Sequence, residues 1–172
     1  MRVTLETERL ILRNPMPEDY EAMFKWSGDP RVNEFMQYTL YTNALGCKEY
    51  IESLDPDEPD KYDLIIVNKE NNEPIGMGGI VWHPENNGWE LGYNLRYDHW
   101  GKGLVPEAMK AIIDYVVSVK GPIHVYGRFC KDNPKSGRVM TKLGMVHTGE
   151  TSYEKMDGSR VFDCYQYEGD FI

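Results

Sequence analysis

Residues 99–108 have the residue types of an anion-binding turn: two glycines, a lysine, and then a proline and a glutamate. A strand-like segment, residues 89–95, precedes the turn, and an amphipathic helical pattern follows it. Pro106 and Glu107 both suit the first turn of a helix, where one N–H is not needed and the helix dipole is positive. Backbone N–H groups of such a turn point outward and bind anions, most often phosphate. The stretch therefore predicts a phosphate-binding turn, with simple tight packing as the alternative.

The positions of the glycines exclude two common phosphate-binding motifs. A Walker A loop requires a further glycine five residues before its Gly-Lys pair and a serine or threonine after the pair. Here Arg96 and Gly103 occupy those two positions. A dinucleotide-binding fingerprint requires another glycine three residues after Gly103, where Pro106 stands. Neither motif describes this turn.

The composition indicates one compact domain with its own core, because 41% of the 172 residues are hydrophobic and 27% are charged. The formal net charge of -9 argues against a nucleic-acid-binding protein that uses a broad basic face. An acidic balance is compatible with a cationic partner, but it is also the ordinary source of solubility. We therefore expect a single domain over residues 1–172 and no nucleic-acid partner.

The cysteines and histidines indicate neither a disulfide framework nor a metal site. The three cysteines lie far apart, and an odd number at such spacing favours reduced thiols in a cytoplasm. The four histidines are scattered singly, without metal-ligand spacing to one another or to cysteine. The first nine residues contain no apolar signal core, and no long apolar run follows. We expect a cytoplasmic protein with no metal and no membrane association.

Hydrophobic periodicity predicts about seven strands and about four helices. The helices are expected to begin near Pro17, Thr42, Leu104 and Asp132. Leu45 and Val119 are among the apolar helical residues expected to face the interior. The strands are expected over residues 10–13, 62–67, 75–82, 89–95, 123–129, 145–153 and 161–167.

One crossover between parallel strands is expected, from residues 89–95 through the central helix to residues 123–129. The other neighbouring strands can pair in antiparallel fashion. In a mostly antiparallel sheet, such a crossover is the natural place for a cleft at the strand ends. The expected fold class is therefore mixed α/β (α+β), with a cleft beside the crossover.

Four separated pieces of the chain have the residues and the order of a known family. They are residues 7–13 with Glu18 and Asp19, residues 90–93, residues 100–103 with 106–108, and Asn133 and Ser136 with residues 139–145. Together these pieces resemble the GNAT acetyltransferases, and most of all the branch that contains the ribosomal-protein N-terminal alanine acetyltransferases. The resemblance covers nearly the whole chain.

The resemblance implies the GNAT fold, with the cofactor in a cleft between splayed central strands, and acetyl-coenzyme A as the acyl donor. The family turn reads Arg or Gln at its first position and Gly or Ala at its last. Trp100 and Val105 stand at these positions here, while Gly103 is kept. The implied cofactor-binding residues are Trp100, Gly101, Lys102, Gly103, Leu104 and Val105 for the pyrophosphate, Tyr93, Asn94 and Leu95 for the pantetheine arm, and Asn133.

Acetyl transfer requires a neutral amine, a stabilised oxyanion and a stabilised or protonated leaving thiolate. Glu90 is the candidate base, because its strand would hold the acetyl end of the donor and some relatives place a catalytic carboxylate there. Its alternative is a surface glutamate on a half-exposed strand. Ser136 is the candidate donor to the thiolate, because Met140 stands where many relatives have a tyrosine. Its alternative is a helix-start serine that satisfies backbone N–H groups.

Two nearby residues are expected to have no part in the chemistry. Asn133 is expected to bind the pantetheine or an ordered water through its amide. Cys130 is expected to be a buried structural thiol and not a covalent acetyl carrier.

The expected activity is transfer of an acetyl group to a primary amine by direct attack in a ternary complex. An α-amine with a pKa of about 8 is partly neutral near pH 7, whereas a lysine at about 10.4 would cost roughly 4 to 5 kcal/mol to deprotonate. The acceptor is a small-molecule or peptide amine, with walls expected from residues 35–41, Tyr153 and Phe162. The alternatives are a catalytically weak coenzyme A-binding sensor or interaction module, and a purely structural partner. For the oligomeric state, the sequence is compatible with a monomer and with a homodimer.

Overall fold

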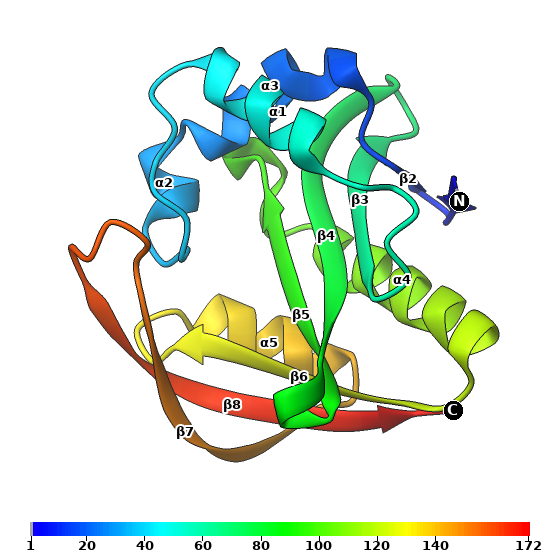
Figure 1. Cartoon of the computed structure of the whole chain (residues 1–172), viewed down its shortest axis with the longest axis vertical. Helices are drawn as coiled ribbons and strands as arrows, with labels where there is room; N and C mark the ends of the chain where they lie inside the picture. The colour runs from blue at the N-terminus through cyan, green and yellow to red at the C-terminus, as the bar shows by residue number, and fades with distance from the viewer. Residues whose placement is uncertain (1) are drawn as a thin grey trace.

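Strand β3 (Lys61–Asn68) buries apolar side chains on both of its faces, so the sheet around it must be covered on both sides. Leu64 and Ile66 belong to one hydrophobic cluster, and Ile65 and Val67 belong to another. The computed structural model describes residues 2–172 and shows helices on both faces of the sheet (Figure 1). The expectation of a mixed α/β fold is confirmed.

The strands form one mixed sheet in the order β1-β2-β3-β4-β5-β6-β8-β7. Each neighbouring pair is antiparallel except β5 and β6, which are parallel. The other strands are β1 (Thr4–Glu6), β2 (Leu10–Arg13), β4 (Glu73–His83), β5 (Gly88–Leu95), β6 (Ile123–Cys130), β7 (Val146–Glu154) and β8 (Val161–Phe171).

Helices α1 and α3 cover one face of the sheet, α4 covers the opposite face, and α5 packs beside β6 (Figure 1). None of the helices in the described part of the chain is both long and apolar enough to cross a membrane. The helical segments are η1 (Pro17–Asp19), α1 (Tyr20–Ser27), α2 (Pro30–Asn33), α3 (Ala44–Ser53), η2 (Pro84–Asn86), η3 (Tyr97–His99), α4 (Leu104–Lys120) and α5 (Pro134–Lys142).

Helix α4 connects β5 to β6 and forms the expected parallel crossover. Its buried stripe includes Ala108, Ile112 and Val116, each with no exposed surface. Val119 continues this stripe into the last turn of the helix, but its side chain is 47% exposed there. The expectation that Val119 faces the interior is therefore wrong, because the core beneath α4 ends before the helix does.

The sequence patterns missed two short elements, so the sheet has eight strands in place of about seven and five α-helices in place of about four within residues 2–172. Strand β1 has three residues and helix α2 has four, which is too short for a periodic pattern. Asp29 initiates α2 by accepting a hydrogen bond from the Arg31 N–H at 2.9 Å.

Leu45 was expected inside the protein, but it is 65% exposed. Helix α3 uses Cys47 and Ile51, one helical turn apart, to face the sheet. At 3.6 residues per turn, Leu45 lies on the opposite side of the helix from these two residues.

Candidate active site

Strands β5 and β6 separate after two residue pairs, and this separation opens a cleft in the sheet. Trp89 pairs with Val125 and Glu90 pairs with Tyr126, which are the two β5–β6 pairs of the described chain. Residues 91–95 of β5 keep their antiparallel partners on β4. On the side of β6, their backbone N–H and C=O groups have no strand partner within residues 2–172. The cleft expected at splayed central strands is present.

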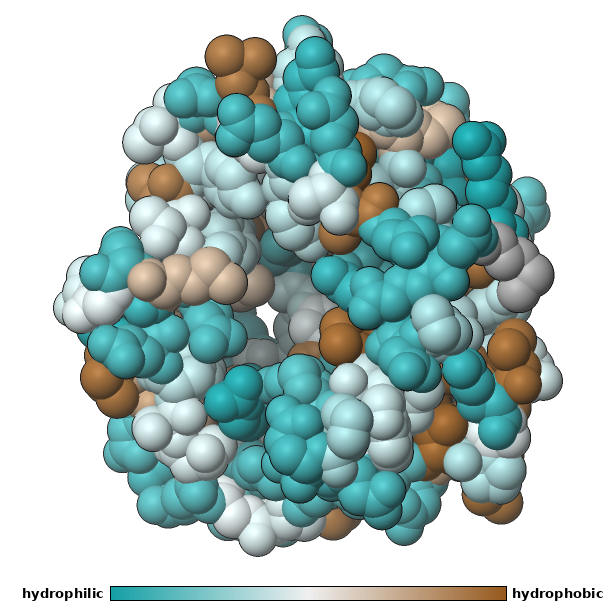
Figure 2. All heavy atoms as spheres, viewed as in Figure 1, coloured by the Kyte–Doolittle hydropathy of each residue, from teal (hydrophilic) through white to brown (hydrophobic). Residues whose placement is uncertain are grey.

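The cleft has a volume of about 910 Å³, which suits a large ligand. Figure 2 shows the molecule hollowed near the middle of one face. All the sequence-predicted site residues line this cleft, although they come from three separate parts of the chain. They are Glu90, Tyr93, Asn94, Leu95, Trp100, Gly101, Lys102, Gly103, Leu104, Val105, Asn133 and Ser136.

The glycine turn before α4 has the backbone conformation of a phosphate cradle. Gly101 and Gly103 have φ angles of 76° and 72°, in the left-handed region that favours glycine. A Cβ at Gly101 would meet no heavy atom within 4 Å in the described part of the chain, so backbone conformation explains this glycine. The N-terminus of α4 follows directly at Leu104. Lys102, from the turn itself, and Lys135, from α5, add positive charge to the cleft lining.

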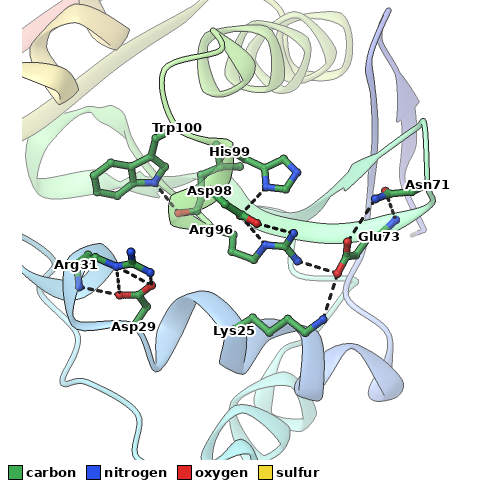
Figure 3. A network of polar contacts seen from close by, with 10 residues as sticks. Lys25, Asp29, Arg31, Asn71, Glu73, Arg96, Asp98, His99 and Trp100 are labelled. Atoms are coloured by element: carbon green, nitrogen blue, oxygen red, sulfur yellow. Dashed lines mark hydrogen bonds and ion pairs between the residues drawn. The ribbon is translucent and has the colours of Figure 1, made fainter.

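A network of ion pairs supports the end of β5 and the turn after it (Figure 3). The Arg96 guanidinium donates through Nη1 to Glu73 Oε1 at 2.7 Å and through Nε to Asp98 Oδ1 at 2.7 Å. Lys25 donates to the same Glu73 oxygen at 3.1 Å. The hydrogen bonds from Arg96 lower the pKa values of Asp98 and Glu73 below their usual range. The network therefore joins α1, β4 and η3 just before the glycine turn.

Trp100 connects the glycine turn to the end of β5. Its indole Nε1 donates to the Leu95 carbonyl at 2.8 Å (Figure 3). Its ring lies 4.8 Å from the ring of Tyr97, and Lys135 Nζ lies 4.8 Å from its centroid. Trp100 thus fixes the turn against its own strand, at the position where the family pattern has arginine or glutamine.

The N-terminal hairpin supports the other side of the glycine turn, a role that the sequence patterns did not reveal. Glu107 Oε1 accepts from the Thr7 hydroxyl at 2.6 Å, and Glu107 Oε2 accepts from Arg9 Nε at 2.7 Å. Arg9 Nη1 also donates to the Lys102 carbonyl at 2.8 Å. Burial opposes the charged form of Glu107, but the hydrogen bonds from Thr7 and Arg9 hold its pKa below the usual value. The only sequence feature that pointed to these contacts was the resemblance of residues 7–13, which include Thr7 and Arg9, to the start of the family sequences.

Glu90 is the last β5 residue before the strands separate, and its carboxylate is already bound by neighbours. Arg128 approaches Oε1 through Nε at 2.8 Å and through Nη2 at 2.7 Å. Tyr126 donates to Oε2 at 3.5 Å, and His83 Nε2 lies 3.4 Å from the same oxygen. The side chain is 23% exposed, so Glu90 is a half-buried cleft residue and not a freely solvated one. Sequence reasoning identified none of these three partners.

Ser136 lies in the first turn of α5 and contacts a side chain from β5. Its Oγ is 2.5 Å from Tyr93 Oη. The N-cap of α5 is Asn133, so the alternative of Ser136 as a capping serine does not describe its position. Burial raises the pKa of the Tyr93 hydroxyl, which keeps it protonated.

The other residues near Ser136 are mostly structural. The Asn133 side chain lines the cleft and caps no backbone N–H of the described chain. Met140 is 1% exposed and packs near Gly127 of β6. Cys130 is 2% exposed and lies opposite Cys164 on β8, as a structural thiol would.

The β7–β8 hairpin contacts residues 33–37, and residues from both segments line the cleft. We call this set of contacts the hairpin bridge. Tyr153 Oη donates to the Phe35 carbonyl at 2.5 Å. Lys155 Nζ donates to the carbonyls of Asn33 and Met36 at 3.1 and 3.0 Å. Figure 1 shows the segment after α2 beside the turn between β7 and β8. Burial lowers the pKa of Lys155 below its usual value.

The glycine turn at the start of α4 and the parted strands of the mixed sheet together form a cleft that suits a phosphate-bearing ligand. A sequence profile described as an acetyltransferase (GNAT) domain matches residues 9–146 of the chain. The chain therefore belongs to the GNAT acetyltransferase family and is an acetyl-coenzyme A-dependent N-acetyltransferase.

One sequence relative and two solved structures are similar to the chain over nearly its whole length. The Bacillus licheniformis protein named uncharacterized N-acetyltransferase p20 is 30% identical over 170 residues, which cover 95% of this chain and 94% of that protein. The ribosomal-protein-S5-alanine acetyltransferase from Vibrio fischeri has a similar fold, with a TM-score of 0.79 at 19% identity over 97% of this chain and 96% of that one. The microcin C7 self-immunity acetyltransferase MccE, solved with acetyl-CoA and AMP, has a TM-score of 0.82 at 20% identity, covering 96% of this chain and 94% of that one.

Proposed function

We propose that the chain transfers the acetyl group of acetyl-coenzyme A to the primary amine of a peptide N-terminus or a small molecule, by direct attack in a ternary complex. The observation that carries this proposal is one cleft that contains both the glycine turn and the candidate catalytic pair, Glu90 and Ser136. The proposed unit is a single acetyltransferase domain over residues 1–172. The three free cysteines support a reducing compartment such as the cytoplasm.

The cleft suits coenzyme A in two respects. The open edge of β5 over residues 91–95 offers backbone N–H and C=O groups to the amides of the pantetheine arm. The glycine turn, the start of α4 and the cationic side chains of Lys102, Lys135 and Arg138 suit the phosphates. The bound thioester supplies an activated carbonyl carbon for the amine to attack.

Glu90 is the proposed base for the attacking amine. Its Oε1 is bound to Arg128, so Oε2 is the oxygen with more capacity to accept a proton, directly or through a water. An α-amine, which is already partly neutral near pH 7, needs less help from a base than a lysine does.

Ser136 is the proposed donor to the leaving sulfur. As the new N–C bond forms and the C–S bond breaks, the sulfur leaves as a thiolate that takes its proton from water. A hydrogen bond from the Ser136 hydroxyl stabilises this thiolate while it leaves. The amine gives up one proton, through Glu90, to solvent.

The acceptor opening is proposed at the hairpin bridge. Phe35, Met36, Gln37 and Tyr153 line the cleft. Because the bridge forms part of the cleft wall, a narrow chain terminus or a small amine fits there better than a side chain on a folded surface.

Thiol release from acetyl-coenzyme A tests the proposed function. The acceptor panel contains peptides with a free N-terminus, the same peptides with a blocked N-terminus and one internal lysine, and polyamines. We expect release with at least one free amine, and a mass gain of one acetyl group on that amine. Absence of release across the panel, together with a coenzyme A-dependent rise in melting temperature, would instead support the coenzyme A-binding sensor.

A further inference from the structure

We propose that Tyr93 is a positioning residue that aims the Ser136 hydroxyl at the leaving sulfur. The inference rests on the proposed role of Ser136. The added group is the hydroxyl of Tyr93 on β5, to which the sequence patterns assigned no chemical role.

The contact between the two hydroxyls joins the two walls of the cleft. Tyr93 lies on the open part of β5, and Ser136 lies in the first turn of α5. Tyr93 Oη is 2.5 Å from Ser136 Oγ and 3.1 Å from the Ser136 carbonyl oxygen. Both residues line the cleft, so a ligand there meets the pair directly.

Two hydrogen-bond patterns satisfy this geometry, since each hydroxyl has one proton. In the first pattern, Tyr93 donates to Ser136 Oγ and the serine proton is directed into the cleft. In the second, Tyr93 donates to the Ser136 carbonyl and the serine proton is directed at Tyr93. A thiolate in the cleft selects the first pattern, because the anion attracts the serine proton.

Burial raises the pKa of Tyr93, so the phenol remains a donor and does not itself give up its proton. The phenol hydrogen bond polarises the serine hydroxyl and makes it a better donor to the sulfur. Without Tyr93, the serine proton is free to rotate towards its own helix or water. Tyr93 therefore stabilises the leaving thiolate without touching it.

The first experiment is a double-mutant cycle of Tyr93→Phe, Ser136→Ala and the double variant, with kcat and KM measured for each. We expect each single change to lower kcat about tenfold or more, with KM for acetyl-coenzyme A changed less than about twofold. The double variant should be no slower than Ser136→Ala alone. Equal effects of Tyr93→Phe in both backgrounds, or full kcat in either single variant with chemistry rate-limiting, would overturn the proposal.

Tyr62→Phe is the matched control for the loss of a phenol. Tyr62 is also a half-buried tyrosine that packs against the main core, but it does not line the cleft. We expect Tyr62→Phe to keep wild-type kcat. A loss of kcat equal to that of Tyr93→Phe would indicate a general stability effect and contradict the positioning role.

The second experiment does not depend on turnover. Coenzyme A bound to the protein is titrated by the ultraviolet absorbance of its thiolate. We expect the bound thiol of the wild-type complex to have a pKa about one pH unit below that in Tyr93→Phe and in Ser136→Ala, because both variants lose the directed hydrogen bond. The cationic side chains that line the cleft, Lys135 and Arg138 among them, are the same in every variant.

The two experiments separate failure of this inference from failure of the proposed function. A thiol pKa that is lowered in the wild type and restored by both variants supports the Tyr93–Ser136 pair even if no amine is acetylated. Equal thiol pKa values in all three proteins, with acetyl transfer intact, overturn the inference and leave the proposed function standing.

Discussion

The partners of Glu90 decide how this side chain can act in the proposed reaction. Arg128 holds one carboxylate oxygen, while Tyr126 and His83 lie near the other. This arrangement fixes the carboxylate in the cleft at the point where β5 and β6 part. A carboxylate held in one position can meet the amine of a bound acceptor, directly or through a water.

Replacing Glu90 by glutamine is expected to lower kcat by about a hundredfold, since a proton acceptor is lost while the shape is kept. The affinity for coenzyme A should stay within about twofold of wild type, because the glycine turn is untouched. Steady-state rates across pH, with coenzyme A affinity by calorimetry, measure both quantities.

Arg128→Gln is the control for Glu90→Gln, because it breaks the same ion pair and keeps the carboxylate. We expect Arg128→Gln to lower kcat less than Glu90→Gln does, because the proton acceptor is kept but is held less firmly. Wild-type rates for Glu90→Gln at every pH would show that the carboxylate is not the base.

At the scale of elements, the glycine turn depends on supports from both sides. The Arg96 network connects it to β4 and α1, and Arg9 connects it to the N-terminal hairpin. These contacts hold the backbone N–H groups in place before a ligand arrives, which lowers the ordering cost of binding.

Gly101→Ala is expected to raise KM for acetyl-coenzyme A about tenfold. The left-handed backbone costs an alanine about 1–2 kcal/mol and the turn relaxes to avoid it. Gly144→Ala is the matched control, since Gly144 has a φ of 88°, also has open space at its Cβ within the described chain, and does not line the cleft. Both variants should have a lower melting temperature than the wild type, but only Gly101→Ala should raise KM for acetyl-coenzyme A. Equal KM values in the two variants would contradict the role of the turn as a phosphate cradle.

The Arg96 network also predicts how stability depends on pH. The pKa values of Asp98 and Glu73 are lower in the folded protein than the unfolded values of about 3.9 and 4.3. The two carboxylates therefore add to the free energy of unfolding above those unfolded values, and this addition is lost as the pH falls through the folded values. We expect the free energy of unfolding to fall below about pH 4. Urea unfolding measured from pH 7 to pH 3 should show that the free energy of unfolding declines less steeply in Arg96→Gln than in the wild type. The same decline in both proteins would show that the Arg96 network is not its cause.

At the scale of the whole molecule, the hairpin bridge joins the N-terminal half to the C-terminal hairpin around the cleft. Its hydrogen bonds run from Tyr153 and Lys155 to backbone carbonyls between residues 33 and 36. The bridge therefore sets the width of the proposed acceptor opening.

Lys155→Met is expected to raise KM for the acceptor by about three- to tenfold, because two hydrogen bonds to carbonyls are lost and the opening widens. The affinity for acetyl-coenzyme A should not change. Hydrogen exchange of residues 33–37 should become faster. Lys48→Met, on the exposed side of α3, is the matched control and should alter none of these quantities.

The sequence by itself determined the features that depend on local pattern. The glycine turn, the helix after it, the parallel crossover and the paired closing strands follow from periodicity and from turn residues near one another in the chain. All the residues that the family-like pieces predict to bind the cofactor line one cleft. Short elements such as β1 and α2 were missed because they lack a full period.

Only the tertiary structure decided the partners of the reactive side chains. Arg128 meets Glu90 across 38 positions of sequence, Ser136 meets Tyr93 across 43, and Tyr153 meets Phe35 across 118. Such pairs depend on strand register and on which face each side chain occupies, and a one-residue slip in register would reverse that face. No local pattern contains this information, because it arises when separate elements pack against a common sheet.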